Sequence, residues 1–147
     1  YEVATIIKDG MKRMYVDGED VFYYLTLYNQ DYPMPAMPTD VEKGILKGMY
    51  RLQAGGRGKV RVNLFGSGTI LREVLAAADL LEQDFGVPAD VYSVTSFSEL
   101  RREALDADRW NLLHPDQPRR TPYVRQCLEG VAAPFVAATD YMRAGPD

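Results

Sequence analysis

Residues 60–86 read VRVNLFGSGTILREVLAAADLLEQDFG and hold the clearest structural signal in the chain. Residues 60–65 are rich in the β-branched, aromatic and aliphatic side chains of a strand, and the glycines of 66–68 permit a tight turn. From Ile70 to Phe85 the apolar residues recur at helical spacing, and Gly86 is a typical helix stop. The stretch predicts one strand, a turn and a helix that packs on that strand.

A second unit of the same kind follows. Residues 90–95 form a strand candidate, and Ser96 with Glu99 has the spacing of a capping box that opens a helix over 99–105. After an irregular loop over 110–122 and a short helix over 123–128, residues 134–139 complete the pattern as a third strand. Strands separated by helices need crossovers, which favour a mainly parallel sheet with flanking helices. The expected class is α/β.

The first part of the chain has a different pattern. We expect a helix over 3–15, a strand buried on both faces over 21–27, and a short helix over 41–50 capped by Asp40. The proline-rich run over 28–40 excludes helix or central strand. A glycine-rich connector over 51–58 predicts a boundary between a first unit, 1–50, and a second, 59–147.

Composition narrows the function classes. The 147 residues carry a net charge of −4, which gives no support for nucleic-acid binding. Apolar runs are too short to cross a bilayer and no signal segment opens the chain, so we expect no membrane partner and a cytoplasmic location. One cysteine and one histidine exclude an internal disulfide and a closed zinc site with nitrogen and sulfur ligands.

Three features could carry chemistry, and each has a simpler structural interpretation. The turn Gly66 to Thr69 could hold an anion at a helix start, but it matches no complete phosphate motif, so glycines that permit the turn and a cap from Ser67 or Thr69 are favoured. His114 is favoured as a hydrogen-bonded loop residue over a proton shuttle. Cys127 is favoured as a small packed side chain over a nucleophile.

The run Tyr32-Pro-Met-Pro-Ala-Met-Pro38 is the candidate contact surface. Its prolines stiffen the backbone, and flexible methionines suit an adaptable interface. The alternative is a stiff strap across the boundary between the two units. We name Tyr32, Met34 and Met37 as possible interface residues.

Six ordered blocks, at 23–32, 34–38, 64–72, 90–100, 109–115 and 138–142, resemble the homodimeric bacterial pyruvate dehydrogenase E1 components. The resemblance covers nearly the whole chain. It implies that residues 1–50 are the end of the middle, pyrimidine-binding domain and that 59–147 begin a transketolase-like C-terminal domain, incomplete at its C-terminus. We therefore expect a fragment.

The resemblance also implies the chemistry of the parent enzyme. That enzyme decarboxylates pyruvate with thiamine diphosphate and Mg²⁺ and reductively acetylates the lipoyl group of E2, the dihydrolipoyl acyltransferase. Its catalytic, cofactor and metal residues precede residue 1, so none is assigned here. We expect this segment to be inactive alone and to serve packing and the interface with a second E1 subunit. Two alternatives stay open: a subunit- or effector-binding module, and a fragment of another thiamine diphosphate-dependent 2-oxo acid dehydrogenase or transketolase-type enzyme.

Overall fold

A four-stranded sheet forms the centre of the computed structural model, which describes residues 1–29, 31 and 33–141. The strands are β1 (Met49–Gln53), β2 (Val62–Gly66), β3 (Ala89–Val94) and β4 (Phe135–Ala138), in the spatial order β1-β3-β2-β4. Strand β2 runs parallel to β3 and β4, and only β1 is antiparallel to its neighbour β3. The predicted α/β class with a mainly parallel sheet is confirmed.

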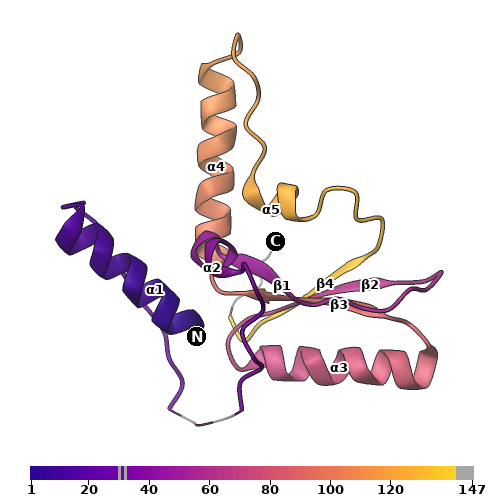
Figure 1. Ribbon diagram of the computed structural model, residues 1–147. Coiled ribbons are helices and arrows are strands. Elements are labelled where there is room, and N and C mark those ends of the chain that lie inside the picture. Colours follow the sequence, from indigo (N-terminus) through magenta and orange to yellow (C-terminus); the bar gives the residue numbers. More distant parts are fainter. Residues whose placement is uncertain (30, 32, 142–147) are drawn as a thin grey trace.

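Helix α3 (Ile70–Phe85) covers one face of this sheet, as Figure 1 shows. Its apolar stripe packs on the inward residues of β2 and β3, and Val91 at the centre of this cluster is fully buried. Gly86 ends the helix with φ 62°, a left-handed conformation that glycine adopts without strain. Both ends of this helix agree with the sequence prediction.

The opposite face carries α4 (Phe97–Leu113) and α5 (Tyr123–Cys127), which pack over a cluster around Met49, Tyr92 and Leu100. Helix α4 is longer than predicted, and its far half projects beyond the sheet beside the returning segment 114–122 (Figure 1). Within the described part of the chain, no helix is both long enough and apolar enough to cross a membrane.

The predicted capping box at the start of α4 forms only in part. The Ser96 hydroxyl accepts a hydrogen bond from the Glu99 amide at 3.0 Å, as expected. The Glu99 carboxylate does not reach back, because it binds Arg102 instead, while the Ser96 amide donates to the carbonyl of Gly48. The start of α4 is thereby tied to the start of β1.

The N-terminal residues form α1 (Glu2–Met11), which continues as a π-helical turn, η1 (Lys12–Val16), so the predicted helix over 3–15 is confirmed. Helix α2 (Glu42–Lys47) lies between α1 and β1. A single carboxylate oxygen of Glu2 accepts hydrogen bonds from Tyr50 at 2.6 Å and from Ser93 at 2.7 Å. These bonds fasten α1 to β1 and β3.

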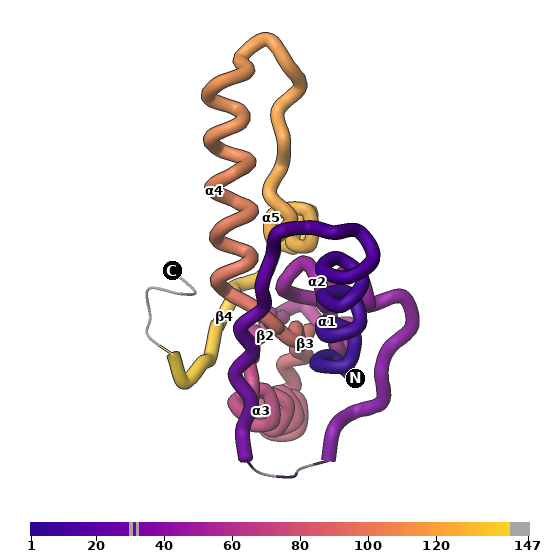
Figure 2. The backbone as a smooth tube through the Cα atoms, turned by 90° about the vertical axis from the view of Figure 1, so that its left-hand side faces the viewer, coloured from indigo at the N-terminus to yellow at the C-terminus, as the bar shows by residue number. Residues whose placement is uncertain are grey.

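The predicted strand over 21–27 is wrong. These residues pair with no strand in the described structure, and Tyr24 is 85% exposed. A run of apolar residues gives a strand only where a neighbouring strand supplies hydrogen bonds, and the described sheet supplies none here. Figure 2 shows the segment passing over the ends of β2 and β4 instead.

Two further predictions near the connector need correction. Asp40 does not cap α2: the N-cap is Val41, without a side-chain bond, and Asp40 itself has φ 59°. Strand β1 was not predicted. Its residues were assigned to the end of the helix 41–50 and to the first positions of the connector 51–58. The division into two units stays a prediction.

Candidate functional site

The chain continues from β2 to its neighbour β3 on one side, whereas the later strand β4 lies on the other side of β2. The carboxyl ends of β2 and β4 therefore mark the point where the direction of the connections reverses. In open α/β sheets this switch point is the usual place for ligands. The turn after β2, residues 66–69, lies here beside Thr139, which follows β4, and the Ser67 hydroxyl donates to the Thr139 hydroxyl at 2.9 Å. The sequence singled out the turn 66–69, on one side of this crevice, and did not indicate that Thr139 lies on the other.

The chain fills this crevice with its own segment 21–29. The ring of Tyr28 lies so close to Gly68 that a Cβ there would come within 3.0 Å of it. The Tyr28 hydroxyl donates to the Asp140 carboxylate, and Thr26 and Tyr141 share a hydrogen bond of 2.7 Å. The bond to Asp140 raises the pKa of Tyr28 above its ordinary value.

The first amides of α3 already have partners inside the chain. Those of Ile70, Leu71 and Arg72 donate to the carbonyls of residues 67–69. Neither Ser67 nor Thr69 caps the helix, since the Thr69 side chain makes no capping bond to a helix amide and the Ser67 hydroxyl donates to Thr139 after β4. The predicted side-chain cap is wrong, while the favoured interpretation of a glycine-permitted turn agrees with the φ of 55° at Gly68.

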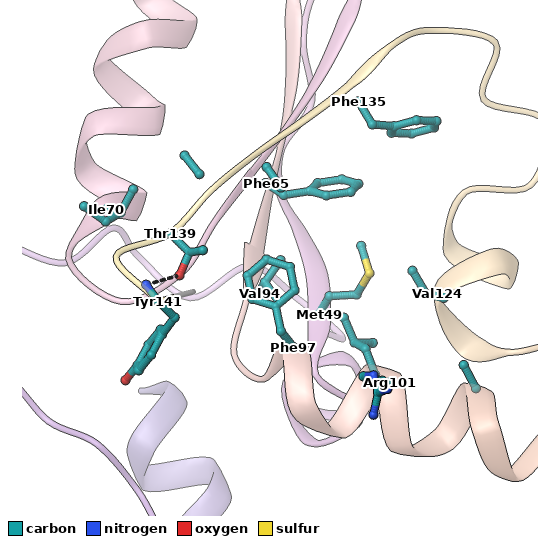
Figure 3. A pocket seen from close by; sticks show the side chains of 14 residues that line it. Met49, Phe65, Ile70, Val94, Phe97, Arg101, Val124, Phe135, Thr139 and Tyr141 are labelled. Carbon is teal, nitrogen blue, oxygen red and sulfur yellow. Dashed lines mark hydrogen bonds between the residues drawn. The ribbon is translucent and has the colours of Figure 1, made fainter. Parts of the chain in front are cut away.

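Beside this crevice, between the sheet and α4, lies an apolar groove with a volume of about 810 Å³ (Figure 3). Phe65 from β2, Phe97 from α4 and Phe135 from β4 converge on it, and Val124 closes it from α5. Its polar lining groups include Arg101, Thr139 and Tyr141. Such a surface is suited to burying apolar groups of a packed partner.

Among the described residues that line the groove there is no aspartate, glutamate or histidine, so they form no acid–base pair. Its one ionisable cation, Arg101, stays charged in proteins and is a poor proton donor at neutral pH. Among the described residues, no three histidine, cysteine, aspartate or glutamate side chains come together to hold a metal ion. The groove offers packing surface rather than reactive groups.

The structure places the two methionines of the predicted contact run in different surroundings. Met37 is half-buried against the cluster of Val41, Ile45 and Tyr50, as a strap would be. Met34 is 44% exposed, and its sulfur lies 3.8 Å from the amino group of Tyr1. Tyr32 lies outside the described residues. An interface role for the run stays a prediction.

In the described structure His114 contacts Trp110 and Cys127 contacts Tyr123, and neither contact pairs a nucleophile with a base. The His114 ring stacks on Trp110 at 4.6 Å, and its Nδ1 lies 2.9 Å from the Trp110 carbonyl oxygen. Cys127 is partly buried against the cluster beneath α5. Both agree with the structural interpretations favoured from the sequence.

Sequence reasoning missed the contact between Tyr28 and Asp140. Both residues lie in blocks that carry the family resemblance, but they are 112 positions apart and no pattern indicated that they meet. The aromatic lining of the groove was also missed, because Phe65 and Phe135 are indistinguishable in sequence from ordinary core residues.

Comparisons with known proteins give matches to one family along nearly the whole chain. The model of the transketolase-like TK C-terminal domain matches residues 48–147, and that of the pyruvate dehydrogenase E1 component middle domain matches residues 1–35. Pyruvate dehydrogenase E1 components of Pseudomonas aeruginosa and Escherichia coli K12 are 51% and 52% identical over 97% of this chain. That of Haemophilus influenzae is 50% identical over the whole chain. The chain spans only 16–17% of the length of these relatives.

Proposed function

Because the chain belongs to the family of transketolase-like C-terminal domains, in the form carried by bacterial pyruvate dehydrogenase E1 components, we propose that it serves as a structural part of such an E1 chain. The parent enzyme would decarboxylate pyruvate and reductively acetylate the lipoyl group of E2 in the cytoplasm. The observation that carries the proposal is the identity of about 50% over nearly the whole chain.

Thiamine diphosphate and Mg²⁺ would be held by other parts of the parent. A Mg²⁺ ion bridging a diphosphate needs carboxylate or other oxygen ligands in octahedral geometry. The described residues do not fit this requirement, because they contain no suitable cluster of acidic side chains and the larger groove is apolar. We therefore assign no residue of this chain to the cofactor.

The role proposed for the segment is packing. Residues 1–50 would complete the middle domain, 51–58 would connect the two, and 59–147 would begin the C-terminal domain. The bonds of Glu2 to Tyr50 and Ser93, and of Tyr28 to Asp140, support this role because they fasten the N-terminal residues to the sheet. The apolar groove would be covered in the parent, within the chain or by the second E1 subunit.

A chimera tests the proposal. The matching 144 residues of the Escherichia coli K12 relative are replaced by this chain, and pyruvate decarboxylation and reductive acetylation of E2 are measured. We expect a folded chimera with both activities within tenfold of the parent, because the catalytic groups are not exchanged. A folded dimeric chimera that binds thiamine diphosphate but lacks both activities would contradict the proposal.

A second candidate function is a subunit-binding module, favoured by the exposure of Met34. If the run 32–38 contacts E2, the variant Met34→Ala/Met37→Ala should reduce recovery of E2 with the chain at least fivefold. Met11→Ala is the matched control, because Met11 is 55% exposed on α1, away from the run. Equal recovery with all three proteins would eliminate the run as the contact.

A further inference from the structure

We propose that a second hollow, open to solvent and lined by residues of α2, β1, β3 and α5, binds a small molecule through a carboxylate or phosphate oxyanion. Its volume is about 460 Å³, within the range of small-ligand pockets. Lys43 comes from α2, Arg51 and Tyr92 from the paired strands β1 and β3, and Cys127 from α5. The site is separate from the apolar groove, and the inference does not depend on the proposed enzyme.

The first observation is the hydroxyl of Tyr92. This side chain lines the hollow and is only 4% exposed, yet its hydroxyl makes no hydrogen bond with any residue that the structure describes. The oxygen is not among the described buried polar atoms that are sealed from solvent, so the hollow can reach it. Solvent therefore reaches this hydroxyl in the free chain, and an acceptor atom of a ligand in the hollow can replace that water as its partner.

The ring of Tyr92 is held independently of its hydroxyl. It packs edge-on against Phe65, with ring centres 5.2 Å apart and planes at 87°. Burial raises the pKa of the hydroxyl, so it remains a hydrogen-bond donor at neutral pH. A fixed donor that opens into a hollow is suited to an acceptor atom of a bound molecule.

The second observation is the charge around this donor. Arg51 is the register partner of Tyr92 in the antiparallel pair, so the two side chains leave the sheet on the same face. Neither Arg51 nor Lys43 forms an ion pair with a residue in the described ranges. Against these two cations, Asp40 is the carboxylate that lines the hollow, which leaves a net positive charge.

This combination indicates the class of ligand. A guanidinium group presents two parallel N–H donors that match the oxygens of a carboxylate or a phosphate. The ammonium group of Lys43 adds charge, and the Tyr92 hydroxyl adds a neutral donor. An apolar or cationic ligand would leave these donors unpaired.

The test is a titration of the full chain, labelled with ¹⁵N, with inorganic phosphate and separately with acetate, at constant ionic strength adjusted with chloride. We expect saturable shifts in the amide signals of β1, β3 and α5 with at least one of the two ions. Saturation by phosphate alone assigns a phosphate ligand, and saturation by acetate alone assigns a carboxylate. Changes that are linear in concentration with both ions would overturn the proposal.

Variants show whether the named side chains bind the ion. Arg51→Gln should weaken binding at least tenfold, and Tyr92→Phe about fivefold, while Tyr92→Phe keeps the ring and its packing on Phe65. Lys8→Gln, which removes an exposed cation of α1 outside the hollow, should bind as the wild type does. Equal affinity of Arg51→Gln, or of a folded Tyr92→Phe, would contradict the proposed site.

Discussion

Gly48 occupies a position that no other residue fills without strain. It joins α2 to β1 with φ 104°, and an added Cβ would lie 2.8 Å from the Ser96 carbonyl oxygen and 3.0 Å from Leu100. We expect Gly48→Ala to lower the free energy of unfolding by about 3 kcal/mol, measured by urea denaturation, because backbone strain and a steric clash add together.

The matched control is Gly86→Ala. Gly86 also has a positive φ of 62°, but nothing lies within 4 Å of a Cβ built there. This variant should lower the free energy of unfolding by only about 1 kcal/mol, because it imposes the left-handed conformation on alanine without a steric clash. Equal losses for the two variants would show that close packing at Gly48 is not as the structure has it.

Tyr50 should make the stability depend on alkaline pH. Its pKa is raised above the ordinary 10.0, first by burial and then by hydrogen bonds to Glu2 and Tyr1. A group with a raised pKa in the folded state contributes stability that is complete below its unfolded pKa and is lost as pH rises toward the folded value. The contribution of Tyr50 should therefore begin to fall near pH 10.

The measurement is urea unfolding of wild type and Tyr50→Phe at several pH values between about 8 and 11. The variant loses the hydroxyl and cannot ionise, so we expect its free energy of unfolding to fall less steeply above pH 10. Parallel curves for the two proteins would mean that Tyr50 ionises equally well in the folded and unfolded chains.

Helix α4 begins with a side-chain cap that the sequence predicted. The Ser96 hydroxyl accepts from the Glu99 amide, which otherwise has no acceptor within the helix. Ser96→Ala should lower the free energy of unfolding by about 1 kcal/mol in urea denaturation. Asp108→Ala, at an exposed position further along the same helix, should be neutral within about 0.5 kcal/mol. A loss for Asp108→Ala as large as for Ser96→Ala would contradict a specific cap.

The elements that the sequence predicted well are those whose signals are local. Helix α3 has a long apolar stripe and a glycine stop, and both are properties of the segment itself. The segment 21–27 was misinterpreted because strand formation depends on a partner elsewhere in the chain. Strand β1 was missed for the same reason, since pairing with β3 identifies it rather than its own composition.

The end of α4 shows a second reason why the sequence did not predict an element. Residues 110–113 were assigned to a loop, but they are helical, and contacts from the returning chain hold them. Arg120 lies over the Trp110 ring at 4.1 Å, and its backbone amide donates to Asn111 at 2.7 Å. These partners are nine or ten positions away, beyond the range of helical periodicity.

The candidate site could be predicted only in part, because it is assembled from distant segments. The turn 66–69 was located from its glycines, and its position at the end of β2 followed from the β-α pattern. The opposite side of the crevice depends on where β4 lies in the sheet. Strand order is a property of the whole molecule, so neither Thr139 nor Asp140 could be placed beside the turn from the sequence.

Strand β4 lies at the edge of the described sheet and should cause the molecule to associate with itself. Phe135 and Val136 are 45% and 53% exposed on it, and edge strands have unpaired backbone groups that can join a strand of another copy. We expect sedimentation velocity of the purified chain to show dimers that become more abundant with concentration. A charged side chain on an edge strand opposes such pairing.

Val136→Lys should therefore raise the dissociation constant of the dimer at least tenfold. Val60→Lys is the matched control, because Val60 is 66% exposed and precedes β2 instead of lying on an edge strand. It adds the same charge and should dimerise as the wild type does. Equal weakening by both substitutions would point to general charge repulsion, and a wild-type chain that stays monomeric at all concentrations would show that the edge of β4 is already protected.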